Sequence, residues 1–184
     1  MGKNLSTFCL CFIAGLVCAN SSIAQKVRWL DFASESGFSI HYPDNWFRIS
    51  ATPKNLDIIS SRQRVEAVII PRGAQMINVL ESSTVPNDDY LSYFKSTDPD
   101  DSVISYATVD IAAANDDSCR KVYVVKSADE VGPKTFYLEN HMFCKIGSRL
   151  FVLALTQWQA DRFNKSAYDL AINMLKSLRV APRP

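Results

Sequence analysis

Two cysteines, Cys119 and Cys144, are the residues whose spacing most directly predicts a chemical role, the formation of a covalent bond. Each lies in a run rich in β-branched and aromatic residues, and the two runs flank the polar turn 129–134, a pattern typical of a β-hairpin. If the centre of that turn lies between Val131 and Gly132, the two cysteines are equally distant from it and lie opposite each other. We therefore expect a Cys119–Cys144 disulfide, in preference to two free thiols.

Nucleophilic catalysis is not indicated. His141 is three residues from Cys144, and on a strand this separation puts the two side chains on opposite faces of the sheet. No Gly-x-Ser-x-Gly elbow occurs. The two Ser-x-x-Lys tetrads start at Ser92 and Ser118, which fall within a predicted helix and at the entrance of a predicted strand, whereas penicillin-binding enzymes use the start of a helix. The sequence predicts no catalytic residue and no enzyme.

Metal and cofactor patterns are also missing. His41 and His141 are the two histidines, and neither His-x-x-x-His nor Cys-x-x-Cys spacing is present. The segment Asp98-Pro99-Asp100-Asp101 lacks the Asp-x-Asp-x-Asp-Gly rhythm of a calcium loop. Neither of the glycine-rich patterns that bind nucleotide phosphates, Gly-x-Gly-x-x-Gly and Gly-x-x-x-x-Gly-Lys, occurs. We expect no metal site and no cofactor.

Acidic residues are concentrated in the middle of the chain, where residues 81–117 contain nine acids and one base, Lys95. Residues 118–184 are the reverse, with eleven bases and five acids. Such a dipolar chain can present its acidic stretch to a cation or to a basic partner. The alternative is that these aspartates cap helices and keep loops solvated. The candidate partner-binding acidic surface comprises Asp88, Asp89, Asp98, Asp100, Asp101, Asp116 and Asp117.

The first 24 residues have the pattern of a signal peptide. Lys3 gives a positive start, and residues 8–17 form an apolar core that is too short for a transmembrane helix. Ser-Ile-Ala at 22–24 favours cleavage before Gln25, with the small residues at 17–19 as the alternative cleavage site. No other stretch is long and apolar enough to insert in a membrane. We expect a periplasmic bacterial protein, or a secreted one.

Removal of the signal peptide leaves 19 basic and 19 acidic residues, since Lys3 is the only charged residue lost. A net charge of zero argues against a nucleic-acid-binding protein, which needs a basic surface to displace counterions.

The remaining segment, 25–184, reads as strands interrupted by two helices, without an internal repeat or linker, and predicts a single domain. One helix is expected from an N-cap at Asn87 to about Thr97, and a second over residues 163–178. The strand 38–42 is expected to pair with 46–51. The other predicted strands are 56–60, 65–70, 76–80, 103–111, 119–127, 135–145 and 150–155, the last of which is apolar throughout and therefore expected to be covered on both faces.

Two short motifs stand near the ends of this pattern, Tyr42-Pro43-x-x-Trp46 and Met174-Leu175-x-Ser177-Leu178. With them the chain resembles the Mog/PsbP-like family over roughly residues 37–180. The resemblance implies an α+β fold, an α/β/α sandwich with a mostly antiparallel central sheet. Members include an extrinsic photosystem II subunit, a Ran-binding protein and many exported bacterial proteins, with no catalytic set to carry over. Cys18 is not preceded by a lipobox, which departs from the lipid-anchored bacterial relatives.

The function expected from these features is a non-enzymatic binding or assembly module of the bacterial envelope, with another envelope protein as its partner. One alternative is an inhibitor or immunity-type protein whose acidic stretch 81–117 covers the basic active-site mouth of a periplasmic enzyme. The other is a small-ligand carrier that uses the aromatic residues of 38–47.

Overall fold

The structure, a computed structural model, describes residues 27–49, 53–60, 72–83, 89–111, 118–130 and 136–181. The predicted signal peptide at 1–24, the predicted strand 65–70 and three of the seven candidate acidic residues lie outside these described residues. Those three are Asp88, Asp116 and Asp117.

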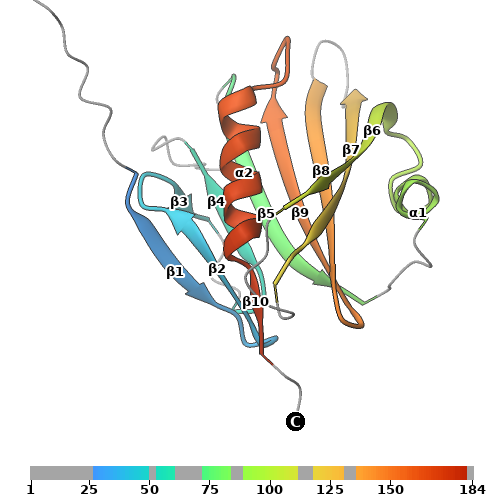
Figure 1. The fold of residues 1–184 in the computed structure, drawn as a ribbon. Helices are drawn as coiled ribbons and strands as arrows, with labels where there is room; N and C mark the ends of the chain where they lie inside the picture. Colours follow the sequence, from blue (N-terminus) through green and yellow to red (C-terminus); the bar gives the residue numbers. More distant parts are fainter. Residues whose placement is uncertain are drawn as a thin grey trace, which may run out of the picture.

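The described segments form two antiparallel sheets and two helices (Figure 1). The larger sheet has the strand order β3-β4-β5-β9-β8-β7-β6, and the smaller has the order β1-β2-β10. This arrangement is an α+β fold with mostly antiparallel sheets, as predicted. The elements are β1 (Trp29–Ala33), β2 (Phe38–Pro43), β3 (Phe47–Arg48), β4 (Leu56–Ile59), β5 (Gln75–Ser82), α1 (Tyr90–Thr97), β6 (Ser102–Asp110), β7 (Lys121–Glu130), β8 (Phe136–Ile146), β9 (Arg149–Trp158), α2 (Lys165–Ser177) and β10 (Arg179–Val180).

One face of the large sheet packs against α2, which crosses in front of it in Figure 1. Alternate residues of β9 that face this side, Phe151, Leu153 and Leu155, are completely buried. Helix α2 begins after Asn164, whose side chain accepts a hydrogen bond from the backbone N–H of Ala167 at 3.1 Å. Residues that recur every three or four positions form its buried stripe: Ala167, Ala171, Ile172, Met174 and Leu175.

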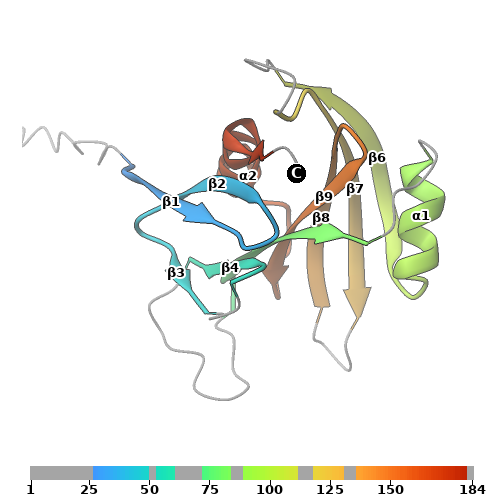
Figure 2. The ribbon, with the colours of Figure 1, turned by 90° about the horizontal axis from the view of Figure 1, so that it is seen from below.

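Helix α1 covers part of the opposite face of the same sheet, beside β6 (Figure 2). Its N-cap is Asp89, which accepts a hydrogen bond from the backbone N–H of Ser92 at 3.0 Å, so the prediction of Asn87 as the cap was wrong by two residues. Tyr90 and Phe94 are the buried residues of α1. They pack against side chains of three neighbouring strands: Val125, Phe143 and Leu150. The two helices therefore lie on opposite faces of the sheet.

Strand β2 covers the predicted strand 38–42, but its neighbours differ from the predicted one. It pairs with β1 on one side and with β10 on the other. Of the described residues of the expected partner, 46–49, the two that form β3 pair with β4 in the large sheet. The backbone N–H of Trp46 donates to the carbonyl of Pro43 at 3.1 Å, and this tight turn leads the chain from one sheet to the other instead of back along β2.

Strands β7 and β8 form the predicted hairpin in a different register. Val122, and not Cys119, lies opposite Cys144 in the ladder. The connection between the two strands spans 131–135, and its middle falls later in the chain than the predicted turn centre. Every pairing derived from that centre was therefore wrong, because register is set by the length and geometry of the connection.

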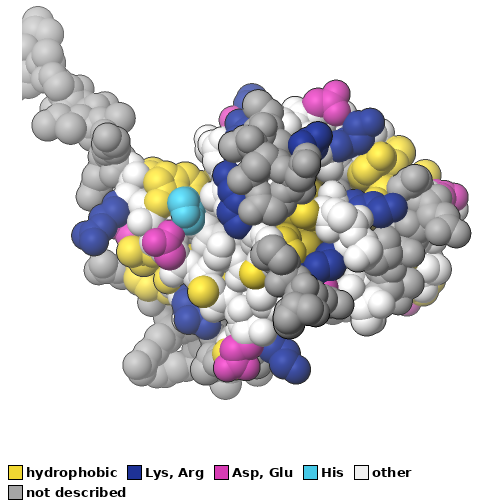
Figure 3. Space-filling view, turned by 60° about the horizontal axis from the view of Figure 1, so that its bottom comes forward, with side chains coloured by type: hydrophobic (Ala, Val, Ile, Leu, Met, Phe, Trp, Pro, Cys, Tyr) yellow, Lys and Arg dark blue, Asp and Glu magenta, His cyan; other side chains and the backbone are white. Residues whose placement is uncertain are grey.

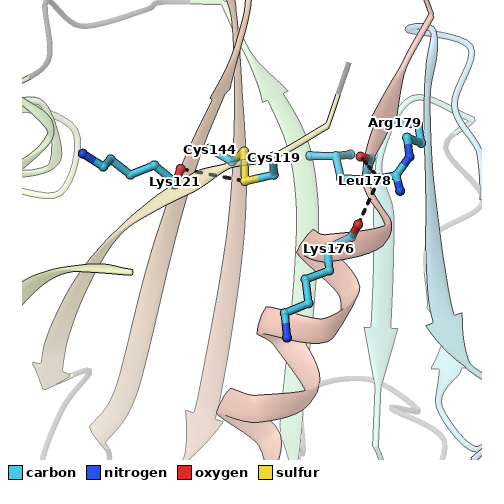
Figure 4. Close-up of a disulfide and its surroundings, with 6 residues drawn as sticks. All are labelled: Cys119, Lys121, Cys144, Lys176, Leu178 and Arg179. Carbon is cyan, nitrogen blue, oxygen red and sulfur yellow. Dashed lines mark hydrogen bonds between the residues drawn. A yellow bond between two sulfur atoms is a disulfide. The ribbon is translucent and has the colours of Figure 1, made fainter. Parts of the chain in front are cut away.

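The predicted disulfide is present, although the register that suggested it is not. Cys119 lies just before β7, and its Cα is 5.9 Å from that of Cys144 in β8. The preceding residue, Ser118, forms an isolated antiparallel bridge with Arg179 of β10. Figure 4 shows the bond between β8 and the chain that passes the end of α2. The disulfide thus joins the large sheet to a segment that contacts the small sheet.

Candidate functional site

Strand β6 forms one edge of the large sheet, and no strand of the described segments pairs with its outer side. It is nine residues long, whereas β3 at the opposite edge has only two. Figure 2 shows it along the margin of the sheet next to α1. The side chains of Ile104 and Tyr106 are 54% and 41% exposed. The strand therefore offers an open row of backbone donors and acceptors with apolar side chains beside it.

The charges around β6 lie at its ends. Residues 102–109 contain no charged side chain, and the whole segment 98–111 contains no base. Asp98 and Asp100 precede the strand, and Asp110 is its last residue. The strand consequently has an uncharged middle and two acidic ends.

The structure places the described members of the candidate acidic surface in different roles. Asp89 and Asp98 cap the two ends of α1, and Asp98 also closes the helix with a backbone N–H bond to the carbonyl of Phe94 at 2.8 Å. Asp100 is exposed. Asp101 instead turns into the protein, where its side chain is 11% exposed. The described acids therefore do not form one continuous patch.

Asp101 meets Glu139 and His141 of β8 in a mostly buried polar cluster. One ligand atom from each of the three side chains lies within 4.8 Å of the other two. Nε2 of His141 is 2.9 Å from Oε2 of Glu139 and 3.8 Å from Oδ2 of Asp101. The aromatic ring of Phe94, on α1, packs on the imidazole with ring centroids 4.6 Å apart.

Two hydroxyl groups hold the carboxylates of this cluster in place. Ser127 Oγ donates to Asp101 Oδ2 at 2.7 Å, and Thr156 Oγ1 donates to Glu139 Oε1 at 2.6 Å. Burial raises the pKa of Asp101 above its ordinary value, and the hydrogen bond from Ser127 offsets only part of that rise. Burial also works to raise the pKa of Glu139, but the hydrogen bonds from His141 and Thr156 outweigh it and leave this pKa below the ordinary value.

Sequence reasoning missed this cluster because its members come from separate parts of the chain. Glu139 and His141 share one face of β8, which their spacing of two residues could have indicated. Asp101 reaches them from the turn before β6, across β7, and only the order β8-β7-β6 brings it there. No sequence pattern reports that approach.

A shallow hollow of about 520 Å³ lies at the C-terminal end of α2, with polar and basic residues such as His41, Lys176 and Arg179 in its wall. Figure 3 brings this end of the molecule forward and shows Lys and Arg side chains spread across that face, with Asp and Glu side chains among them. The aromatic side chains of Phe38 and Trp46 do not line it, because both are buried in the core. The aromatic stretch 38–47 is thus mainly core.

These features define a small α+β module with an edge strand whose middle is uncharged and whose outer side no described strand covers, and with a mostly buried carboxylate–imidazole cluster at the start of that strand. Neither of the described helices is long and apolar enough to cross a membrane.

No protein-family model and no curated protein matches the chain. Similar solved structures include one from Bacteroides thetaiotaomicron, at 10% identity and a TM-score of 0.46, which covers 82% of this chain and 47% of that one. The Saccharomyces cerevisiae Ran-binding protein Mog1p has 9% identity and a TM-score of 0.47, over 84% of this chain and 96% of that one. The cyanobacterial PsbP (CyanoP) of Synechocystis has 12% identity and a TM-score of 0.48, over 89% and 97%. The chain spans about half of the Bacteroides protein, and at these identities the likeness concerns the fold alone.

Proposed function

We propose that this protein is an exported, non-enzymatic binding module that captures an extended segment of another envelope protein along the outer side of β6. The observation that carries the proposal is the edge itself: β6 is nine residues long, no strand of the described segments pairs with its outer side, and Ile104 and Tyr106 are exposed on it. An added strand would satisfy the outer backbone groups, and its alternate side chains would contact those two residues.

The outer edge of β6 lacks most of the features that prevent edge strands of soluble proteins from pairing non-specifically with other strands. Natural edges are usually very short, or carry Lys or Pro in the strand. Residues 102–109 contain neither. The one interruption is an irregular register between Val103 and Ser105, near the start of the strand. An edge of this length that no described segment covers is best explained by a partner that pairs with it.

The acidic ends indicate the chemistry of that partner. A strand with Lys or Arg near its ends would place opposite charges against Asp98 and Asp100 at one end and Asp110 at the other. A second copy fits less well. If two β6 strands paired antiparallel about Tyr106, Asp110 of each would lie opposite Ser102 of the other and diagonal to its Asp100, so like charges would be neighbours at both ends of the pair.

A synthetic peptide tests this proposal without the native partner. The probe is nine alternating Val and Thr residues with two Lys at each end, and its matched control has Glu in place of each Lys. The Lys-ended peptide should slow amide hydrogen exchange in β6 selectively, and the Glu-ended peptide should not, because the flanking aspartates attract one and repel the other. Raised salt should weaken the effect.

Substitutions locate the binding surface. Ile104→Lys and Tyr106→Lys should each weaken capture of the Lys-ended peptide by about tenfold or more, the usual cost of losing a central interface anchor. Ile49→Lys is the matched control, since Ile49 is 47% exposed and lies outside β6. Protection elsewhere than in β6, or equal losses in all three variants, would sink the proposal. Concentration-dependent dimers that lose stability in Tyr106→Lys would assign the edge to a second copy instead.

The same variants serve to identify the natural partner. Envelope extracts passed over the immobilised protein should yield a protein that is retained by Ile49→Lys and lost by Ile104→Lys. If the captured protein is a hydrolase that loses activity on binding, the module acts as an inhibitor. A captured protein whose activity is unchanged would support assembly.

A further inference from the structure

The cluster of Asp101, Glu139 and His141 carries more negative charge than its surroundings balance. Among the described residues, the ion pairs of both carboxylates are with His141 alone, and no Lys or Arg takes part. Asp129 adds a further negative charge nearby. Two carboxylates with side chains only 11% and 19% exposed are costly to leave uncompensated. A divalent cation with both carboxylates and a neutral imidazole would bring the three-residue cluster to neutrality.

The distances suit a small cation. Zn²⁺ bonds of about 2.0–2.2 Å in tetrahedral geometry set neighbouring ligand atoms about 3.4 Å apart. Nε2 of His141 is 2.9 Å from the nearest Glu139 oxygen and 3.8 Å from the nearest Asp101 oxygen, one value on each side of that spacing. The ligand oxygens of Asp101 and Glu139 lie within 4.8 Å of each other, so side-chain rotations would be needed to bring all three atoms to that spacing.

Neighbouring side chains hold the three candidate ligands in position, as is usual at metal sites. Thr156 fixes the second oxygen of Glu139, and Ser127 fixes the carboxylate of Asp101. The ring of Phe94 packs on the imidazole and limits its rotation. The pair of His41 and Asp31 on the small sheet provides a contrast. Its atoms approach to 3.0 Å, but its side chains are 54% and 86% exposed, and no third ligand from the described part of the chain joins them.

We propose that Asp101, Glu139 and His141 bind one Zn²⁺ ion, with a water molecule as the fourth ligand. One nitrogen and two carboxylate oxygens are a donor set that zinc accepts. Calcium requires six to eight oxygens, and magnesium favours an octahedral shell of oxygens, so both are less suited. The ion would tie Asp101, the residue immediately before β6, to β8 across the intervening β7. This inference does not depend on β6 as a docking edge, since it concerns an ion in the protein alone.

Titration with Zn²⁺ alone tests the site. The purified protein is stripped of metal with a chelator and titrated calorimetrically. We expect saturable binding of one ion per chain. His141→Ala and Glu139→Gln should each weaken it at least tenfold, and Thr156→Val by about tenfold through loss of the hydroxyl that orients Glu139. His41→Ala is the matched control and should leave the affinity unchanged.

Cobalt provides a readout that a merely structural role would not change. Co²⁺ in the same site should give the visible absorption of a four-coordinate nitrogen–oxygen complex, altered in Glu139→Gln and absent in His141→Ala. Circular dichroism of the metal-free variants establishes that they fold. If His141→Ala does not fold, Glu139→Gln and Thr156→Val decide the matter. Absence of one-to-one zinc binding, or equal weakening in His41→Ala and His141→Ala, would overturn the proposal.

Discussion

Reduction of the Cys119–Cys144 disulfide should lower the free energy of unfolding by about 3.5 kcal/mol at 25 °C, from the loop-closure entropy of the unfolded chain. The bond closes a loop with a sequence separation of 25 residues. A cross-link over a loop of that length removes about 12 cal/mol/K of entropy from the unfolded state. For a protein of this size the loss corresponds to a fall in Tm of about 7–14 °C.

The measurement is urea unfolding of the protein without its signal peptide, with and without a strong reductant, followed by tryptophan fluorescence and circular dichroism. The double variant Cys119→Ala/Cys144→Ala is the control. The reductant should shift the midpoint of the wild-type protein and leave that of the double variant unchanged. Because both cysteines are buried, the variant should be somewhat less stable than the reduced wild type, through lost packing.

Two results would refute this reasoning. A reductant effect below about 1 kcal/mol would mean that the cross-link does not restrict the unfolded chain as a loop of this length must. Two reactive thiols per chain in the denatured, unreduced protein would mean that Cys119 and Cys144 are not bonded at all.

Three further predictions concern single side chains. Arg149→Met should lower the free energy of unfolding, measured by chemical denaturation, by about 3–5 kcal/mol. The buried guanidinium of Arg149 donates to both carboxylate oxygens of Glu81 at 2.7 Å, and the substitution leaves that carboxylate without it. Adding Glu81→Gln to Arg149→Met should recover part of the loss. The hydrogen bond from the Ser92 backbone N–H holds the pKa of Asp89 below its ordinary value. The ionised carboxylate therefore stabilises α1 at pH values above the ordinary pKa, and this stabilisation is lost as the pH falls through the lowered pKa of the folded protein. Asp89→Asn should remove that pH dependence from hydrogen exchange in α1. Asn164→Ala should cost about 1 kcal/mol through loss of the N-cap of α2, and Asn164→Asp should restore it, both read from thermal unfolding.

Local sequence patterns correctly predicted those helices and strands that bury one side along their whole length. The buried stripe of α2 follows helical spacing, and β2 follows strand alternation, with Phe38 and Ile40 buried and Ser39 and His41 exposed. In both, periodicity reports burial directly because one side of the element always faces the core.

Patterns failed where burial depends on a distant neighbour. The strand predicted over 103–111 forms as β6, but alternate residues that would be buried inside a sheet, Ser105 and Ala107, are exposed because β6 is at the edge, where little covers either face. No strand is predicted over residues 29–33, yet they form β1 because β2 offers them a partner. Asp101 was assigned to an acidic surface, whereas Ser127 and His141 draw it inward.

The contacts that cross-link separate parts of the protein are distributed unevenly. Their distribution determines which region of the protein can become more ordered when a partner binds. Arg149 of β9 donates to the carbonyl oxygens of Ser36 at 2.6 Å and Gly37 at 3.3 Å and so joins the large sheet to the small one, while the disulfide joins β8 to the segment that contacts the small sheet. Both ties lie on the α2 side, and β6 at the far edge pairs with β7 only. We therefore expect amide exchange to be slowest in β8 and β9 and fastest, among the long strands, in β6. A partner strand or a bound cation at Asp101 would then order the region that the fold itself restrains least.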